Sequence, residues 1–151
     1  MKPLTREWIE KAEGDYEAAG LLLRARKHPN YDASCFHAQQ CVEKWMKAML
    51  IEAGIQFERT HDLPALLDLL RAVNRSWELL RPAATTLSDY AVRFRYPGSS
   101  ADKAMAKIAF QACEVVRETL REHLDMSATS SSKPKAKSEA RKRRQSKPKS
   151  K

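Results

Sequence analysis

Residues 32–53 read DASCFHAQQCVEKWMKAMLIEA, and this stretch decides the fold class. Its larger apolar residues recur every three or four positions, a spacing that places them on one face of an α-helix: Cys35, Ala38, Val42, Trp45, Met46 and Met49. Polar residues fall roughly opposite, with His37 at the border: Gln40, Glu43, Lys44 and Lys47. Because Gly54 is a typical residue just beyond a helix, the pattern predicts a helix over residues 32–53.

The same helical spacing recurs on both sides of this stretch. It predicts helices over residues 5–27, 62–73, 76–90 and 101–124, with a kink or a broken start at Pro82. In the last of these the inward stripe is expected to be Met105, Ile108, Ala109, Ala112, Val116 and Leu120. Short connections make consecutive helices antiparallel neighbours. We therefore expect an all-α protein, an up-and-down four-helix bundle with one additional short helix at 62–73.

The charge is divided unequally along the chain. The net charge of the 151 residues is +9, from 28 Lys and Arg against 19 Asp and Glu. Residues 1–126 hold 18 of each sign, so the whole excess lies in residues 127–151, where Arg141, Lys142, Arg143 and Arg144 form one run. Such a segment has too few apolar side chains to offset the entropy of ordering it. We expect a helical domain over 1–126 and a disordered basic tail over 127–151.

The remaining composition excludes several classes. The three cysteines have neither the number nor the spacing of a disulfide framework or a zinc site, and reduced, largely buried thiols are expected. No His, Asp or Glu cluster has metal-ligand spacing, so neither a metal nor another cofactor is predicted. No apolar run approaches the roughly 20 residues that span a bilayer, and no apolar signal core follows Met1. A cytoplasmic protein without a membrane segment is expected.

Four short motifs then occur in a fixed order. The central helix carries FHAQQ at residues 36–40, followed by Glu43-Lys44 and by Lys47-Ala48. Thr60-His61-Asp62-Leu63 follows at the next predicted helix start, and Arg95-Tyr96-Pro97-Gly98 forms a turn before the last helix. A first helix beginning WIEKAEGDY at residues 8–16 completes the series. Together these motifs resemble the HEPN family over about residues 5–124.

The resemblance implies a four-helix bundle, usually a homodimer, that associates with nucleotides or nucleic acid. Many HEPN proteins act beside a minimal nucleotidyltransferase, and some such pairs form toxin–antitoxin modules. Some relatives are metal-independent ribonucleases that use an Arg followed after four to six residues by His. Here Arg95 is followed by Tyr96, Pro97 and Gly98, and no His occurs before His123. The pair needed to activate a ribose hydroxyl is absent, so ribonuclease activity by that mechanism is not expected.

Three groups of residues are candidates for ligand binding, and each has a purely structural alternative. Arg93, Arg95 and Tyr96 could bind a phosphate while a base stacks, or Arg95 could pair with a carboxylate in a turn shaped by Tyr96-Pro97. His61 could contact an anion at a helix start, or the segment could only cap that helix. A third group could line a dimer cleft or a nucleotide pocket, or could belong to a solvated face with weak Glu–Lys pairs: His37, Gln40, Glu43 and Lys44.

Three functions remain open at this point. The first is a noncatalytic, dimeric HEPN partner of a minimal nucleotidyltransferase with a nucleotide-facing surface. The second is a ribonuclease toxin with a rearranged site around Arg95 and His61. The third is a nonspecific nucleic-acid binder acting through the basic tail, whose Lys and Arg side chains would release counterions from phosphates. A tail that only improves solubility is the alternative to the third.

Overall fold

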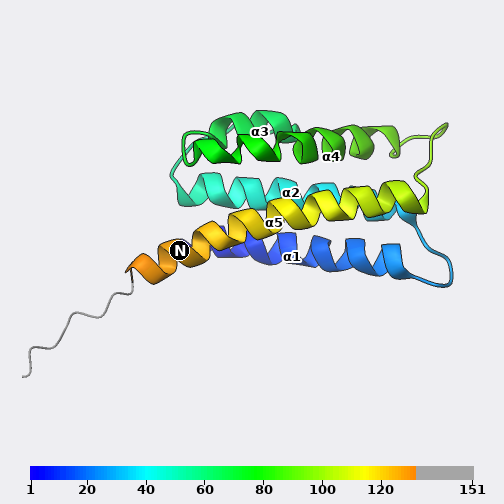
Figure 1. Cartoon of the computed structure of the whole chain (residues 1–151), viewed down its shortest axis with the longest axis horizontal. Helices are drawn as coiled ribbons and strands as arrows, with labels where there is room; N and C mark the ends of the chain where they lie inside the picture. The colour runs from blue at the N-terminus through cyan, green and yellow to red at the C-terminus, as the bar shows by residue number, and fades with distance from the viewer. Residues whose placement is uncertain (132–151) are drawn as a thin grey trace, which may run out of the picture.

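The computed structural model describes residues 1–131, with side chains through residue 127, and the described part is helical without a strand. The helices are α1 (Pro3–Arg24), α2 (Tyr31–Glu52), α3 (Leu63–Leu70), the 3-10 helix η1 (Arg75–Leu80), α4 (Arg81–Arg93) and α5 (Lys103–Ser131). The four longer helices alternate in direction, and the α1–α2 and α4–α5 connections meet at one end of the bundle (Figure 1). The predicted up-and-down four-helix bundle with an additional short helix is confirmed.

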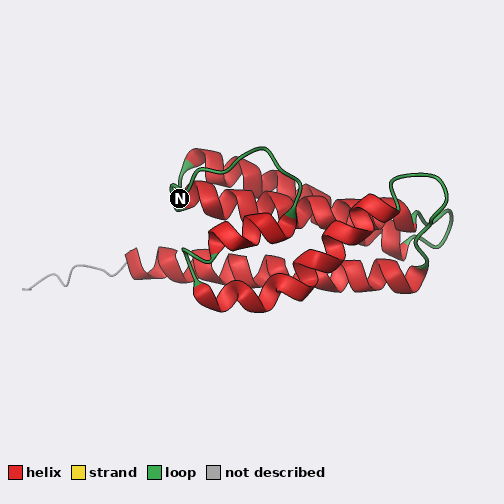
Figure 2. Cartoon of the chain, turned by 90° about the horizontal axis from the view of Figure 1, so that it is seen from above, coloured by secondary structure: helices red, strands yellow, loops and turns green. Residues whose placement is uncertain are grey.

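Helix α2 lies at the centre of the molecule and contacts α1, α3, α4 and α5. The side chain of Asn30 caps its start by accepting from the backbone N of Ala33 at 3.0 Å. At its end Gly54 has a φ of 71°, and the backbone N of Ile55 donates to the carbonyl of Leu50 at 2.9 Å. This left-handed glycine stops the helix as predicted. Seen from above, the long helices run roughly along one common direction, and loops gather at the ends of the bundle (Figure 2).

The predicted helix over 76–90 is divided in two. Residues Arg75–Leu80 form η1, and Pro82 then occupies one of the first two positions of α4, where its missing N–H costs no hydrogen bond. Pro82 therefore gives a broken start rather than a kink. Trp77, Leu80 and Leu87 of this region are buried.

Helix α5 departs from its prediction in two ways. Ile108 was expected to point inward, but its side chain is 48% exposed, while Ala106 and Cys113 are fully buried. The buried stripe is therefore rotated around the helix axis, because α5 approaches α2 through small side chains. The helix also continues to Ser131, so residues 127–131 of the basic tail are helical. The prediction for residues 132–151, including Arg141, Lys142, Arg143 and Arg144, lies outside the described residues.

One continuous core joins all the helices. Trp45 and Met49 are 2% exposed, and Met46, Leu50, Leu66, Leu67 and Leu70 are fully buried. The three cysteines, Cys35, Cys41 and Cys113, are free and buried, as expected from their number and spacing. A core of this kind leaves only a small part of α2 accessible, and that part carries the candidate site.

Candidate functional site

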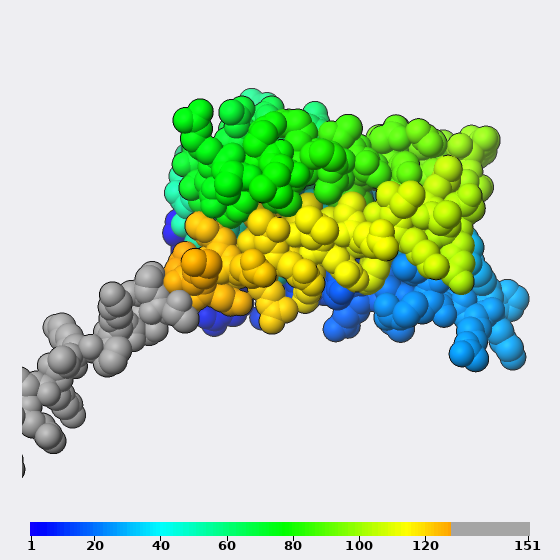
Figure 3. All heavy atoms as spheres, in the orientation of Figure 1, coloured from blue at the N-terminus to red at the C-terminus, as the bar shows by residue number. Residues whose placement is uncertain are grey.

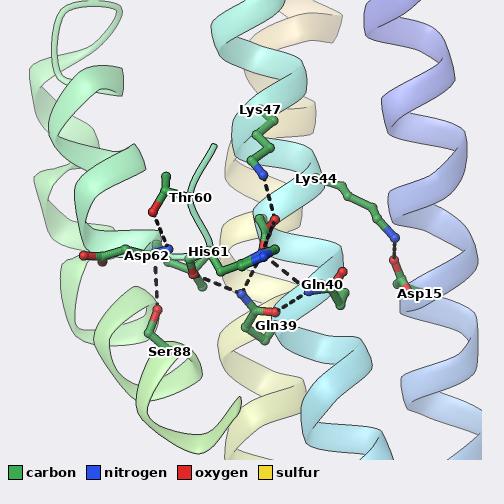
Figure 4. Close-up of polar contacts among 11 residues, drawn as sticks. Asp15, Gln39, Gln40, Lys44, Lys47, Thr60, His61, Asp62 and Ser88 are labelled. Atoms are coloured by element: carbon green, nitrogen blue, oxygen red, sulfur yellow. Dashed lines mark hydrogen bonds and ion pairs between the residues drawn. The ribbon is translucent and has the colours of Figure 1, made fainter. Parts of the chain in front are cut away.

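Between Ser34 and Leu50 all but four residues of α2 are buried, and these four are partly exposed and lie on one side of the helix: Phe36, His37, Gln40 and Lys44. We call these four residues the α2 stripe. It lies between α1 on one side and the connection to α3 on the other (Figure 4). Three of its members, His37, Gln40 and Lys44, are residues that the sequence selected as ligand-binding candidates.

A buried carboxylate organises the polar contacts beside the stripe. Glu43 is 4% exposed and Lys47 is 6% exposed, and the Nζ of Lys47 donates to Oε1 of Glu43 at 2.7 Å. The side-chain amides of Gln39 and Gln40 donate to Oε2 of Glu43 at 3.0 and 3.4 Å. Burial raises the pKa of Glu43, but the hydrogen bonds from Lys47, Gln39 and His61 outweigh it, and the pKa lies below 4.5. The interpretation of Glu43 and Lys47 as solvated residues is therefore wrong.

His61 is attached to this carboxylate from the opposite segment. Its Nδ1 lies 3.1 Å from both carboxylate oxygens of Glu43 (Figure 4). Because an ionised carboxylate only accepts, Nδ1 carries a proton in this contact. The His61 side chain is 80% exposed. The arrangement fixes the imidazole through Nδ1 and leaves Nε2 facing solvent.

The backbone around His61 is held by its neighbours. Thr60 Oγ1 accepts from the backbone N of Asp62 at 3.0 Å, and Asp62 Oδ1 accepts from the backbone N of Ala65 at 3.2 Å. The backbone N of Leu63 donates to Ser88 Oγ at 3.2 Å, and the carbonyl of His61 accepts from Gln39. Asp62 therefore caps the start of α3, as the structural alternative for this segment expected. The side chain of His61 does not cap the helix and contacts Glu43 beside the α2 stripe.

A second histidine on the stripe is bound in the same way from α1. Asp15 accepts from Nδ1 of His37 at 2.8 Å through one oxygen and pairs with Lys44 through the other. The Asp15 side chain is 11% exposed, so this contact is largely shielded from water. The Lys44 charge is thereby neutralised by Asp15.

Arg95 meets the α2 stripe at its N-terminal end. Its guanidinium carbon lies 5.4 Å from the centre of the Phe36 ring. Arg95, Phe36, Tyr90 and Phe94 line a hollow of about 370 Å³, which we call the Arg95 hollow. Asp32 also lines it and accepts from the backbone N of Ala101 at 2.6 Å. Among the described residues no carboxylate pairs with Arg95, so the ion-pair alternative for Arg95 is not what the structure shows.

Arg93 and Tyr96, the other two candidates from residues 93–96, do not line the Arg95 hollow. Arg93 donates to Asp89 at 2.7 Å, and its guanidinium carbon lies 5.7 Å from the centres of the Tyr90 and Phe94 rings. Tyr96 is 63% exposed and does not line the Arg95 hollow. The structure thus brings together His37, Gln40, Lys44 and His61 and places Arg95 one helical turn away at Phe36. Arg93 lies beside two rings of the Arg95 hollow without lining it, and Tyr96 lies outside it.

Neither a metal site nor a membrane segment is found in the described chain. Within residues 1–131 no group of three or more His, Cys, Asp or Glu side chains is placed to hold a metal ion. The helices of that part are too polar or too short to cross a bilayer.

Comparisons with known proteins agree with the helical fold. The HEPN domain model matches residues 5–123. A protein of Methanocaldococcus jannaschii named "Putative toxin MJ1304" is 35% identical over 96 residues, which cover 60% of this chain and 61% of that protein. The chain therefore spans under two thirds of the length of this curated relative.

Two crystal structures share the fold. TT1696 from Thermus thermophilus is 25% identical with a TM-score of 0.63, and the match covers 78% of this chain and 96% of that one. ST0689, described as an archaeal HEPN homologue, is 24% identical with a TM-score of 0.64, and the match covers 82% and 98% of the two chains.

The burial of the Glu43–Lys47 pair predicts a loss of stability when the carboxylate of Glu43 is removed. Glu43→Gln removes the charge that compensates Lys47, and we expect the free energy of unfolding at pH 7 to fall by about 3 kcal/mol. The exposed Glu17, which has no ion pair among the described residues, gives the control Glu17→Gln, for which the change should stay within about 0.5 kcal/mol.

The same pair of proteins tests the pH dependence. Because the folded pKa of Glu43 lies below 4.5, its contribution is complete above that pH and is lost as pH falls through the folded pKa. In urea denaturation the difference between wild type and Glu43→Gln should therefore shrink below pH 4.5. A difference that stays constant down to pH 3 would contradict the assignment.

Proposed function

The chain belongs to the HEPN domain family, and from this membership we propose that it is a noncatalytic, nucleotide-associated protein that acts as a homodimer with a minimal nucleotidyltransferase. The observation that carries the nucleotide-binding part is the Arg95 hollow. It combines a guanidinium that has no carboxylate partner among the described residues with aromatic rings that a base can contact.

The chemistry of the Arg95 hollow suits a nucleotide. A guanidinium binds phosphate through paired N–H donors, and an aromatic ring supplies a stacking surface for a base. The volume of about 370 Å³ falls in the range of small-molecule sites. Asp32 accepts a backbone hydrogen bond from Ala101 on one oxygen, which holds the segment before α5 against α2.

The positions of the histidines favour binding over catalysis. Cleavage of a phosphodiester requires an acid–base group and a charge-stabilising group at the same phosphate. His61 is bound to Glu43 and His37 is bound to Asp15, whereas Arg95 lies over Phe36 at the end of the α2 stripe. Within the described part of a single chain, no imidazole lines the hollow with Arg95.

The oligomeric part of the proposal has support in an exposed apolar face. Ile108 and Val115 are seven residues apart on α5 and are 48% and 50% exposed. Side chains of this kind on a helix gain by packing against another subunit. The nucleotidyltransferase partner, and a toxin-like role in such a pair, are proposed from the family and from the name of the archaeal relative. A neighbouring gene for a nucleotidyltransferase is expected, and unrelated neighbours would count against the partner.

Calorimetry tests the nucleotide proposal. ATP and GTP titrated into the full chain should bind with a dissociation constant on the order of 100 μM, and Arg95→Ala should weaken binding about tenfold or more through loss of a charge-assisted contact. Arg71→Ala is the matched control, because Arg71 is exposed, pairs with Glu78 and does not line the hollow, and its effect should stay within about twofold. Absence of heat at millimolar nucleotide, or equal losses in both variants, would refute the proposal.

Sedimentation equilibrium tests the dimer. The full chain should sediment with twice its monomer mass. The double variant Ile108→Ser with Val115→Ser should raise the dimer dissociation constant at least about tenfold. Leu79→Ser changes a residue that is 68% exposed on η1 and should leave the dimer intact. A wild-type monomer at high micromolar concentration would overturn the dimer, and unchanged association of the double variant would exclude this face.

A second candidate function, ribonuclease activity at a rearranged site, has one observation in its favour. The carboxylate of Glu43 orients His61 through Nδ1 and leaves Nε2 exposed, which is the arrangement of a carboxylate-supported general base.

RNA cleavage by the purified full chain decides between the two functions. If His61 is a general base, His61→Ala should reduce cleavage at least about a hundredfold, while His28→Ala, at an exposed loop residue, should not. The noncatalytic proposal predicts no cleavage above background in any of the three proteins. Cleavage that depends on His61 would replace the first proposal with the second.

A further inference from the structure

A hollow of about 520 Å³ lies between the end of α1 and the start of α5, on a part of the surface that contributes nothing to the α2 stripe. Four cationic side chains line it, Arg24 and Arg26 from α1 and its following loop and Lys103 and Lys107 from α5, together with Tyr31. We call it the cationic hollow. In the space-filling view these two segments border one another at the loop end of the molecule (Figure 3).

The charges of the cationic hollow are not compensated within the described residues. None of its four cations makes an ion pair there, whereas Lys44, Lys47 and Arg117 each bind a carboxylate. No carboxylate lines the hollow. Since residues 1–126 carry equal numbers of acidic and basic side chains, this local excess is an uneven distribution of charge and not a reflection of the total. Like charges held around one concave surface favour an anion between them.

A smaller hollow of about 270 Å³ adjoins the first and shares Arg24 with it. Tyr16 and Phe110 line this second hollow, and their rings stack with centres 5.2 Å apart at an interplanar angle of 16°. Glu17 also lines it, so a phosphate would be repelled there while an uncharged ring would not. The two hollows therefore suit the two halves of a nucleotide, the phosphate in the cationic hollow and the base beside Tyr16 and Phe110.

Gly20 leaves room for the side chain that links the two hollows. A Cβ at Gly20 would lie 2.8 Å from Nη1 of Arg24, so the guanidinium lies directly over the glycine. Arg24 can therefore reach a phosphate in one hollow and border the base in the other. A larger residue at position 20 would displace it.

We propose that the cationic hollow and the adjoining aromatic hollow form a binding site for single-stranded nucleic acid, with phosphates held by Arg24, Arg26, Lys103 and Lys107 and a base against the Tyr16–Phe110 pair. A positively charged surface beside aromatic rings is the usual means of binding single strands without reading sequence. The site is separate from the Arg95 hollow, so it stands or fails independently of the proposed nucleotide binding at Arg95.

Fluorescence anisotropy of the full chain with a labelled oligothymidylate of about ten nucleotides tests the phosphate half. Arg26→Gln with Lys107→Gln should weaken binding about tenfold and lower the slope of log K against log salt by roughly 1.4, or 0.7 per lost contact. Lys11→Gln with Arg75→Gln removes the same charge from exposed residues outside both hollows and should change affinity less than about twofold. The basic tail is present in all three proteins, so its contribution cancels. Equal losses in the two variants would overturn the proposal.

Two further measurements test the role of Arg24, which lines both hollows, and the contact of a nucleobase with Tyr16 and Phe110. Arg24→Gln removes the guanidinium that lines both hollows and should weaken binding severalfold. An abasic strand of the same length and charge should bind the wild-type protein about tenfold more weakly than oligothymidylate. Unchanged affinity in Arg24→Gln would remove Arg24 from the site, and equal affinity for the two strands would remove the aromatic pair.

Discussion

The packing of α2 against four other helices is the constraint on which the rest of the structure depends. A helix enclosed by α1, α3, α4 and α5 must be apolar around most of its circumference. In α2 the residues from Ser34 to Leu50 are buried at all but the four positions of the α2 stripe, and most of the buried side chains are apolar. The stripe is the only part of this segment that can serve a ligand, so the demands of the core limit the candidate site to a few side chains.

The Glu43–Lys47 pair shows how the centre of the bundle tolerates charge. Burying one charge alone would be costly, but here the carboxylate is met by Lys47, by two glutamine amides and by His61. Lys47 also lies 5.8 Å from the centre of the Trp8 ring, so α1 shields the cation on its other side. Because His61 belongs to the connection before α3, the same carboxylate fixes the position of that connection on α2. A buried ion pair thus joins the core to the exposed imidazole.

The sequence was sufficient for the architecture and for part of the site. Helical spacing located every long helix, and Gly54 and Pro82 marked boundaries. The motifs selected candidates that the structure places on or beside the α2 stripe: His37, Gln40, Lys44, His61 and Arg95. The burial of Glu43 and Lys47 was missed because the residues that cover them, Trp8 and His61, are distant in sequence. Ile108 was misplaced because α5 packs through Ala106 and Cys113, whose small side chains contribute little to an apolar pattern. The cationic hollow was hidden because Arg24 and Lys103 meet only after folding, and the balanced charge of residues 1–126 gave no sign of it.

Native-state hydrogen exchange of the α2 backbone amides tests the central role of this helix most directly. If α2 is held from four sides, the amides from Cys41 to Leu50 can exchange only when the whole bundle unfolds. Their exchange free energies should then equal the global free energy of unfolding measured in urea and should be the highest in the chain. Exchange of these amides through a local opening, at a free energy below that of the α5 amides around Cys113, would contradict the account.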